Sequence, residues 1–289
     1  MASVRVGQRR INGNTTLKKL GNIKHIICVA SGKGGVGKST TACNLALALQ
    51  QLGNKVGLLD ADIYGPSLPM MMGVVPGTRP QIKDQKFMLP IVAHGIECNS
   101  MGFLVDERTA MVWRAPMIIS AFNQMLTDTA WSDLDYLVVD MPPGTGDIQL
   151  SLAQSVRISG AVIVTTPQDV ALLDARKGIE MFKKVDVPIL GVVENMSIHV
   201  CVKCGHEEAI FGKGGGDRLS QDYGVAVIGR LPLDITIRER TDSGNPVVAS
   251  APSHPATAAY LQLGSNVVAQ ITQAAMDAAA RPTISISDD

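Results

Sequence analysis

The sequence predicts an α/β fold, with a doubly wound, mainly parallel β-sheet flanked by helices and formed by a single domain. Short apolar runs rich in Val, Ile and Leu alternate along the 289 residues with segments of helical periodicity. A glycine-rich loop at residues 32–39 lies between the first apolar run and the first helical segment. Continuous apolar runs are typical of strands buried on both faces, and ligands of such sheets bind at the carboxyl ends of the strands.

The expected elements follow this alternation in order along the chain. The first strand is expected at Ile26 to Ala30, and the helix after the loop has Leu45, Leu49 and Leu52 at helical spacing. Further strands are expected at residues 56–59, 136–139, 161–164, 189–193 and 226–228. Another helix is expected to carry one apolar face, formed by Leu172, Ala175, Ile179 and Phe182. The segment from Met70 to Met111 is rich in Pro, Gly and Met and predicts an inserted loop or hairpin region.

The two ends of the chain are expected to lie outside the domain, which spans residues 23–279. Residues 1–22 are basic and expected to be flexible, and residues 280–289 are expected to be a disordered tail. Because no acidic residue precedes Asp60, a mitochondrial presequence is the alternative for the first segment, although serine enrichment and a clear apolar face are missing. The sequence therefore predicts a cytoplasmic protein, with the mitochondrial matrix as the alternative.

The charge and hydropathy of the chain argue against some classes of partner. The formal net charge is zero, with 26 basic and 26 acidic residues, which gives no reason to expect a nucleic-acid surface or an acidic-lipid anchor. No apolar stretch approaches the ~18 residues that a membrane span needs. We therefore expect neither nucleic acid nor membrane as a partner.

Residues 32–39 read Gly-Lys-Gly-Gly-Val-Gly-Lys-Ser, a complete G-x-x-x-x-G-K-[ST] phosphate loop. Glycines let successive backbone N–H groups and the dipole of the following helix converge on phosphate oxygens. Lys38 is expected to bind the β- and γ-phosphates of ATP, and Ser39 a magnesium ion. Lys33 is a second lysine within this motif, at a position where most phosphate loops have no fixed residue, and it limits the chain to a smaller class of P-loop proteins. The expected nucleotide-binding residues here are Gly32, Lys33, Gly34, Gly35, Val36, Gly37, Lys38, Ser39 and Thr40.

Two carboxylates, Asp60 and Asp62, follow the second strand at the edge where a γ-phosphate should lie. Alternation along an extended chain would put both on the same side. We expect Asp62 to orient the attacking water and Asp60 to support the magnesium shell, because phosphoryl transfer depends on positioning and charge neutralisation. Helix capping or turn formation is the structural alternative for this pair.

Polar residues also follow two later strands. Asp140 ends the strand Tyr136 to Val139 in the manner of a Walker B element, which delivers a carboxylate to the magnesium's water shell. Gly144 lies in the Pro-Pro-Gly turn that follows, and its N–H is expected to be free to approach the γ-phosphate. Asn195 follows the strand at residues 189–193 and could read the edge of a base with its amide, or form a turn.

The cysteines divide into an unpaired set and one motif. Five cysteines, an odd number, fit a reducing compartment, and only Cys201 and Cys204 have a C-x-x-C spacing, with His199 and His206 beside them. Two thiolates make half of a tetrahedral zinc or four-iron site. Zinc bound with the histidines, a redox dithiol and a site shared by two subunits all remain open, and the shared site satisfies the ligand count most simply. No chemistry is assigned to Cys28, Cys43 and Cys98.

Together these motifs resemble the Mrp/ApbC family of iron–sulfur cluster carrier ATPases, on the MinD/ParA branch of P-loop proteins. The resemblance runs from about Ile23 to about Pro252, most of the chain. It is carried by Lys33 within the phosphate loop, Asp60-Ala-Asp62-Ile-Tyr-Gly-Pro-Ser, Asp140-Met-Pro-Pro-Gly-Thr-Gly-Asp147, Glu194-Asn-Met-Ser197, the C-x-x-C with Ile210-Phe-Gly-Lys-Gly-Gly, and Ile237-Arg-Glu with Gly244-Asn-Pro-Val.

The resemblance implies a homodimer with ATP sites at the subunit interface. Lys33 would reach the nucleotide of the other subunit and act with Lys38 and Asp62 in hydrolysis, and Asn195 would contact adenine. A labile [4Fe-4S] cluster would be bridged by the cysteine pairs of both subunits. Apo iron–sulfur proteins and a cluster-assembly scaffold would be the partners.

Two other functions are compatible with the phosphate loop. A MinD/ParA-type positioning switch usually needs a basic amphipathic C-terminal helix or a DNA-binding surface. The segment from Pro255 to Ala280 is rich in alanine and has no lysine or arginine, which argues against membrane targeting. A zinc-stabilised scaffold with residual ATPase activity is the third possibility, and it predicts a colourless protein that holds zinc tightly.

Overall fold

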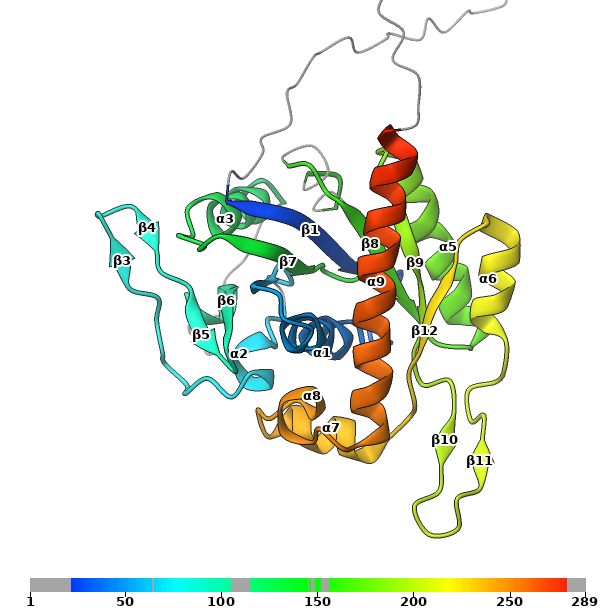
Figure 1. Cartoon of the computed structure of the whole chain (residues 1–289). Helices are drawn as coiled ribbons and strands as arrows, with labels where there is room; N and C mark the ends of the chain where they lie inside the picture. The colour runs from blue at the N-terminus through cyan, green and yellow to red at the C-terminus, as the bar shows by residue number, and fades with distance from the viewer. Residues whose placement is uncertain are drawn as a thin grey trace, which may run out of the picture.

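An eight-stranded β-sheet forms the centre of the protein (Figure 1). The computed structural model describes residues 22–63, 65–104, 115–144, 146, 149–151 and 156–279. The strand order is β12-β9-β8-β1-β7-β2-β6-β5, and neighbours pair in parallel except β5, which is antiparallel to β6. These strands are β1 Ile23–Ala30, β2 Val56–Asp60, β5 Ile91–Ala93, β6 Ile96–Ser100, β7 Leu134–Asp140, β8 Gly160–Thr165, β9 Ile189–Glu194 and β12 Val227–Arg230.

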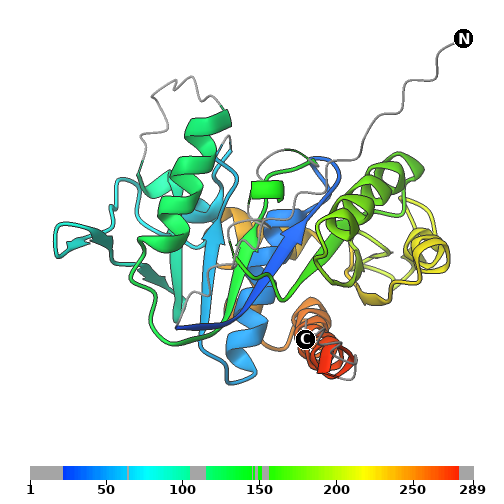
Figure 2. The same ribbon diagram turned by 90° about the horizontal axis from the view of Figure 1, so that it is seen from above.

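Helices cover both faces of the sheet (Figure 2). Alternate residues of β1 point to opposite sides, so Ile27 joins the core with α1, α8 and α9, while Ile26 joins the core with α3, α5 and α6. The predicted doubly wound α/β architecture is therefore confirmed. The helices are α1 Lys38–Gln51, α2 Leu68–Met71, α3 Ala115–Thr127, α5 Asp169–Lys184, α6 Gly215–Tyr223, α7 Ile235–Asp242, α8 Val247–Ser250 and α9 Pro255–Ala279, with a 3-10 helix at Met101–Phe103.

Two short hairpins stand outside the main sheet. The first joins β3, Ile82–Lys83, to β4, Phe87–Met88. The second joins β10, His199–Val200, to β11, Glu207–Glu208, and carries the C-x-x-C motif in its turn. Figure 1 shows this second hairpin extending away from the helices and the main sheet.

The apolar faces predicted for α1 and α5, called stripes below, are buried in the structure except at one residue. The side chains of the α5 stripe are all buried, and so are Leu45 and Leu49 of α1. Leu52 was expected to continue the α1 stripe, but the helix ends at Gln51 and Leu52 is 43% exposed. Helical spacing alone does not show where a helix ends.

The segment from Met70 to Met111, predicted to be an inserted loop or hairpin region, contains the β3–β4 and β5–β6 hairpins, but β6 is not an insertion. This strand is part of the main sheet and pairs in parallel with β2. Its sequence does not resemble a buried strand because Asn99 and Ser100 are polar, yet both are buried and hydrogen-bonded. The Asn99 amide donates to Thr129 Oγ1 at 2.7 Å, and the Ser100 hydroxyl donates to Asp60 Oδ2 at 3.0 Å. Helix α3 was likewise not among the expected elements.

The predicted ends of the chain fall largely outside the described residues. Of the basic segment 1–22 the structure describes only Asn22, and the tail 280–289 is not described. Within the described part, none of the helices combines the length and the apolar character needed to cross a membrane.

Candidate functional site

The phosphate loop connects β1 to α1 at the carboxyl edge of the sheet, as predicted. Gly37 has a φ of 82°, and a Cβ there would lie 2.1 Å from Asn195 Nδ2. At Gly32 a Cβ would lie 2.1 Å from the backbone carbonyl of Asp174 in α5. Both positions therefore need glycine, because neighbouring atoms approach too closely for any side chain. Gly34 and Gly35 are exposed, so the outer part of the loop is open to a ligand.

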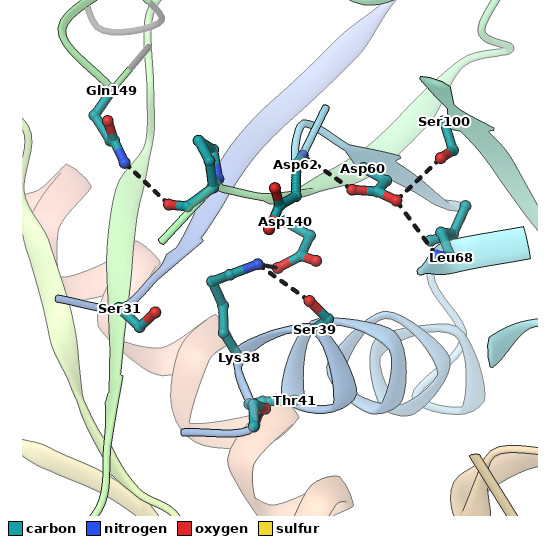
Figure 3. A network of polar contacts seen from close by, with 12 residues as sticks. Ser31, Lys38, Ser39, Thr41, Asp60, Asp62, Leu68, Ser100, Asp140 and Gln149 are labelled. Atoms are coloured by element: carbon teal, nitrogen blue, oxygen red, sulfur yellow. Dashed lines mark hydrogen bonds and ion pairs between the residues drawn. The ribbon is translucent and has the colours of Figure 1, made fainter. Parts of the chain in front are cut away.

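A buried ion pair occupies the centre of the site (Figure 3). Lys38 Nζ donates to Asp140 Oδ1 at 2.5 Å and to Ser39 Oγ at 3.1 Å. Lys38 and Asp140 are both buried, and β7 delivers the carboxylate to the first turn of α1. The lysine and the carboxylate predicted for phosphates and magnesium are thus brought together, and in this state they neutralise each other.

A second buried carboxylate lies on the adjacent strand. Asp60 is in register with Asp140, and its oxygens accept from the Ser100 hydroxyl at 3.0 Å, the Asp62 N–H at 3.0 Å and the Leu68 N–H at 3.3 Å. Burial, together with the charge of Asp140, raises the pKa of Asp60 to about 7. Burial also raises the pKa of Asp140, and Lys38 opposes that rise. Two buried carboxylates beside one ammonium make a site that favours an added cation.

The oxygen ligands at this site suit a magnesium ion that also binds a nucleotide and water, rather than a metal ion bound by protein ligands alone. Hydroxyl and carboxylate oxygens from Ser39, Asp60 and Asp140 are the ligands that Mg²⁺ prefers, usually completed by water and substrate phosphates. Among the described residues there is no cluster of three or more His, Cys, Asp or Glu side chains able to hold a metal ion. Magnesium here would therefore take most of its ligands from the nucleotide and from water.

The position of Asp62 is not the one that alternation along an extended strand predicts. The strand ends at Asp60, and the chain turns so that the Asp62 N–H caps the Asp60 carboxylate (Figure 3). Asp62 lies at the rim of the site and is partly exposed, whereas Asp60 is buried. The two aspartates thus have different surroundings, and their separate roles, Asp60 in the magnesium shell and Asp62 in orienting water, stay predictions.

The Pro-Pro-Gly turn differs from the expectation in one respect. The N–H of Gly144 was predicted to be free, but it donates to the Ser31 carbonyl at 3.0 Å, because a backbone N–H in a packed turn needs a partner. Gln149, which the sequence analysis missed, holds the same turn by donating to the carbonyls of Pro142 at 3.0 Å and Gly144 at 3.1 Å. Asp147 lies outside the described residues.

Asn195 and Lys33 differ in their surroundings. The Asn195 amide is buried and donates to the Val36 carbonyl at 2.8 Å, so it packs against the phosphate loop. Lys33 is partly exposed, and its carbonyl accepts from the Ser31 hydroxyl at 2.8 Å. In the described part of the chain its ammonium group has no ion pair or hydrogen bond.

The cysteine motif forms a compact turn at the end of its hairpin. The Cys201 N–H donates to the His206 carbonyl at 2.9 Å, and the Gly205 N–H donates to the Cys201 carbonyl at 2.8 Å. The sulfur of Cys201 accepts from the backbone N–H groups of Lys203 and Cys204 and from the Cys204 thiol, which lowers the pKa of Cys201. Cys201 is partly exposed and Cys204 is exposed. Two accessible sulfurs, one of them readily ionised, are thus presented outward.

Among the described residues no group of three or more His, Cys, Asp or Glu side chains is placed to hold a metal ion, so the geometry gives no support to a zinc site completed by histidines of the same chain. His199 Nδ1 donates to the Leu233 carbonyl at 3.0 Å, which ties this side chain to the segment between β12 and α7. The Ser197 N–H also donates to this segment, at the Leu231 carbonyl. Residues 195–199 lead into the hairpin, and the bonds made by Ser197 and His199 anchor them to the segment that follows β12 of the main sheet.

Comparison with known proteins assigns the chain to a family. The family model described as "ParA: NUBPL iron-transfer P-loop NTPase" matches residues 22–268. The chain belongs to this family. It is 62% identical over 244 residues to an iron–sulfur cluster carrier protein of Pseudomonas fragi, covering 84% of this chain and 85% of that protein. It is 52% identical over 256 residues to the mouse iron–sulfur cluster transfer protein NUBPL, covering 88% and 80%.

Solved structures of other proteins share the fold. A nucleotide-binding protein from Archaeoglobus fulgidus in complex with ADP superposes with a TM-score of 0.68 at 36% identity, covering 77% of this chain and 87% of that one. The cell division ATPase MinD of Pyrococcus furiosus superposes with a TM-score of 0.61 at 23% identity, covering 85% and 99%. The MinD likeness concerns the fold alone.

The raised pKa of Asp60 predicts that the nucleotide-free protein loses stability as the pH rises. The folded chain holds this proton to about pH 7, whereas an unfolded chain releases it near the ordinary value of 3.8. The stabilising contribution is therefore complete below about pH 4 and lost as the pH rises through 7. Thermal unfolding measured between pH 5 and 8 should show this decline, and Asp60→Asn should flatten it. Asp222→Asn, which changes an exposed carboxylate, should leave the slope as it is; an unchanged slope in Asp60→Asn would assign the titration elsewhere.

Proposed function

We propose that the protein is an ATP-binding and ATP-hydrolysing carrier that holds a [4Fe-4S] cluster, as cargo, between two copies of the chain and delivers it to apo-proteins. The observation that carries the proposal is the accessible cysteine pair, because it offers half of the four thiolates that such a cluster needs. The names of the relatives from Pseudomonas fragi and mouse support iron–sulfur transfer. Exposed thiols require a reducing compartment, either the cytoplasm or the mitochondrial matrix.

Nucleotide binding would rearrange the buried ion pair at the centre of the site. Lys38 would exchange the Asp140 carboxylate for the β- and γ-phosphates, and Asp140 would then be available to the water shell of magnesium. Ser39 and Asp60 would hold the same ion directly or through water. Magnesium supplies charge neutralisation on the phosphates, while Asp62 at the rim would orient the attacking water.

The same rearrangement can act on the cysteine hairpin through one short segment. Asn195 contacts the phosphate loop at Val36, and Cys201 follows six positions later in the chain. The intervening Ser197 and His199 are bonded to the segment after β12. A nucleotide that moves the loop therefore acts on the base of the hairpin, which supports a carrier whose cluster affinity depends on the nucleotide bound.

Anaerobic reconstitution with iron and sulfide tests the carrier function. The protein should bind about two irons per chain, one cluster for each pair of chains, with the absorbance near ~400 nm that a four-iron thiolate cluster gives. Transfer of the cluster to an apo-acceptor should follow by activation of that acceptor. Stoichiometric zinc with no visible absorbance would contradict the proposal and leave only an ATPase.

Mixed dimers would show whether Lys33 acts across the interface. Its ammonium group has no partner among the described residues, and the exposed loop around it could meet a facing nucleotide. We expect Lys33→Ala to bind ATP but to hydrolyse it at least about tenfold more slowly, because transition-state charge is less neutralised. Asp62→Asn should also bind and hydrolyse slowly. In a dimer of one Lys33→Ala chain and one Asp62→Asn chain, one of the two sites combines an intact Asp62 with the intact Lys33 of the other chain, so hydrolysis should be restored there. If the mixed dimer is no more active than either homodimer, Lys33 acts in the site of its own subunit.

A further inference from the structure

The turn after β7 places one backbone N–H group beside the phosphate loop. Pro142 and Pro143 have no N–H, so Gly144 supplies the first backbone donor after Met141. This N–H donates at 3.0 Å to the carbonyl of Ser31, the residue directly before the loop. A triphosphate bound in the loop extends one phosphate further than a diphosphate. We therefore expect the γ-phosphate of ATP, and no part of ADP, to compete with Ser31 for this N–H.

The side chain of Gln149 holds the backbone on both sides of that N–H. Gln149 is buried and points toward the turn, and its amide nitrogen donates to the carbonyls of Pro142 at 3.0 Å and Gly144 at 3.1 Å (Figure 3). A primary amide has two N–H donors, so both are used within this one turn. The two carbonyls belong to the peptide groups before and after the one that carries the Gly144 N–H. Gln149 thus fixes the flanking peptides, while the peptide between them is held by Ser31.

We propose that Gln149 is a positioning residue that gives the site its preference for ATP over ADP. With both flanks fixed, the Gly144 N–H exchanges the Ser31 carbonyl for the γ-phosphate when a single peptide group rotates. Little order then has to be gained when the triphosphate binds, which favours binding. ADP leaves the turn as it is, so the order of the turn does not affect ADP affinity. The inference rests on the nucleotide binding in the proposed function and is independent of the cluster.

Only an amide of this length meets the needs of the turn. The two carbonyls lie against a buried side chain, and a buried carbonyl without a donor is costly. Leucine in place of Gln149 has a similar size but no donor. Glutamate has the same shape, but its ionised carboxylate can only accept and would repel both carbonyls. Both substitutions therefore remove the two bonds while keeping the volume of the side chain.

Binding of two nucleotides measures this preference. Gln149→Leu should bind Mg-ADP as the parent does, but it should bind the non-hydrolysable β,γ-imido analogue of ATP about tenfold more weakly, because two neutral hydrogen bonds that order the turn are lost. Gln149→Glu should show the same selective loss. Isothermal titration calorimetry gives both affinities. Unchanged or tighter binding of the analogue would overturn the proposal, since the side chain would then be neutral or would hold the turn against the triphosphate.

Gln51→Leu is the matched control. The Gln51 amide also donates to a backbone carbonyl, that of Val248 at 2.7 Å, but at the opposite end of α1 from the phosphate loop. This variant can lose thermal stability, yet its ratio of ADP to analogue affinity should equal that of the parent. If the Gln149 variants lose ADP binding as well, the residue supports the fold and the inference is wrong. If the parent itself binds neither nucleotide, the proposed function fails instead.

Discussion

Lys38→Ala should weaken Mg-ATP binding by at least about 100-fold, roughly 3 kcal/mol. The substitution removes the cation that faces the β- and γ-phosphates. It also leaves Asp140 buried without its 2.5 Å partner, so that an uncompensated carboxylate, or its proton, remains where phosphate must bind. Both effects oppose nucleotide binding. Isothermal titration calorimetry with Mg-ATP measures the loss.

Lys24→Ala is the matched control for this experiment. Lys24 also pairs with an aspartate, Asp135, at 2.6 Å, but the lysine side chain is 72% exposed and the pair lies at the opposite edge of the sheet. Exposed pairs contribute little to stability, so ATP affinity should not change. The double variant Lys38→Ala with Asp140→Asn should recover part of the thermal stability but not the affinity. Unchanged ATP affinity in Lys38→Ala would show that this loop does not hold the phosphates.

The fold and the nucleotide residues could be predicted because they depend on local patterns. Apolar runs identified the central strands, and the G-x-x-x-x-G-K-[ST] spacing located Lys38 and Ser39. Asp60 and Asp140 were found because each ends such a run. The structure brings these four residues together at one edge, as parallel strands require.

The residues that the sequence did not reveal depend on contacts between distant segments. Strand β6 was missed because Asn99 and Ser100 look exposed in sequence but are satisfied by Thr129 and Asp60. Gln149 has no local signal, since its role is to hold a turn through two backbone carbonyls. The bond of the Gly144 N–H to Ser31 was also invisible, because it depends on how closely the turn packs against β1. Buried polar residues that belong to no recognisable motif, such as Asn99, Ser100 and Gln149, were therefore the ones that sequence patterns could not place.

The largest effect on cargo is expected at the cysteine pair, where Cys201→Ala or Cys204→Ala should each abolish cluster binding. A bridged cluster takes two thiolates from each chain, so either change removes two of its four ligands per dimer. Iron and sulfide content and the absorbance near ~400 nm should fall to background after anaerobic reconstitution. Both residues are on the exposed turn, so neither change should unfold the chain, and Mg-ATP binding by the variants verifies this.

Cys98→Ala is the appropriate control because the five thiols differ in their surroundings. Burial raises the pKa of Cys98 to about 12, and it raises the pKa of Cys28 and Cys43 as well, so these side chains remain protonated inside the core. Backbone N–H groups of the hairpin turn instead lower the pKa of Cys201, and the thiolate is the form that binds iron. Cys98→Ala should therefore keep the full iron content. Iron that survives the loss of both Cys201 and Cys204 would contradict the carrier assignment, because no other accessible thiol exists among the described residues.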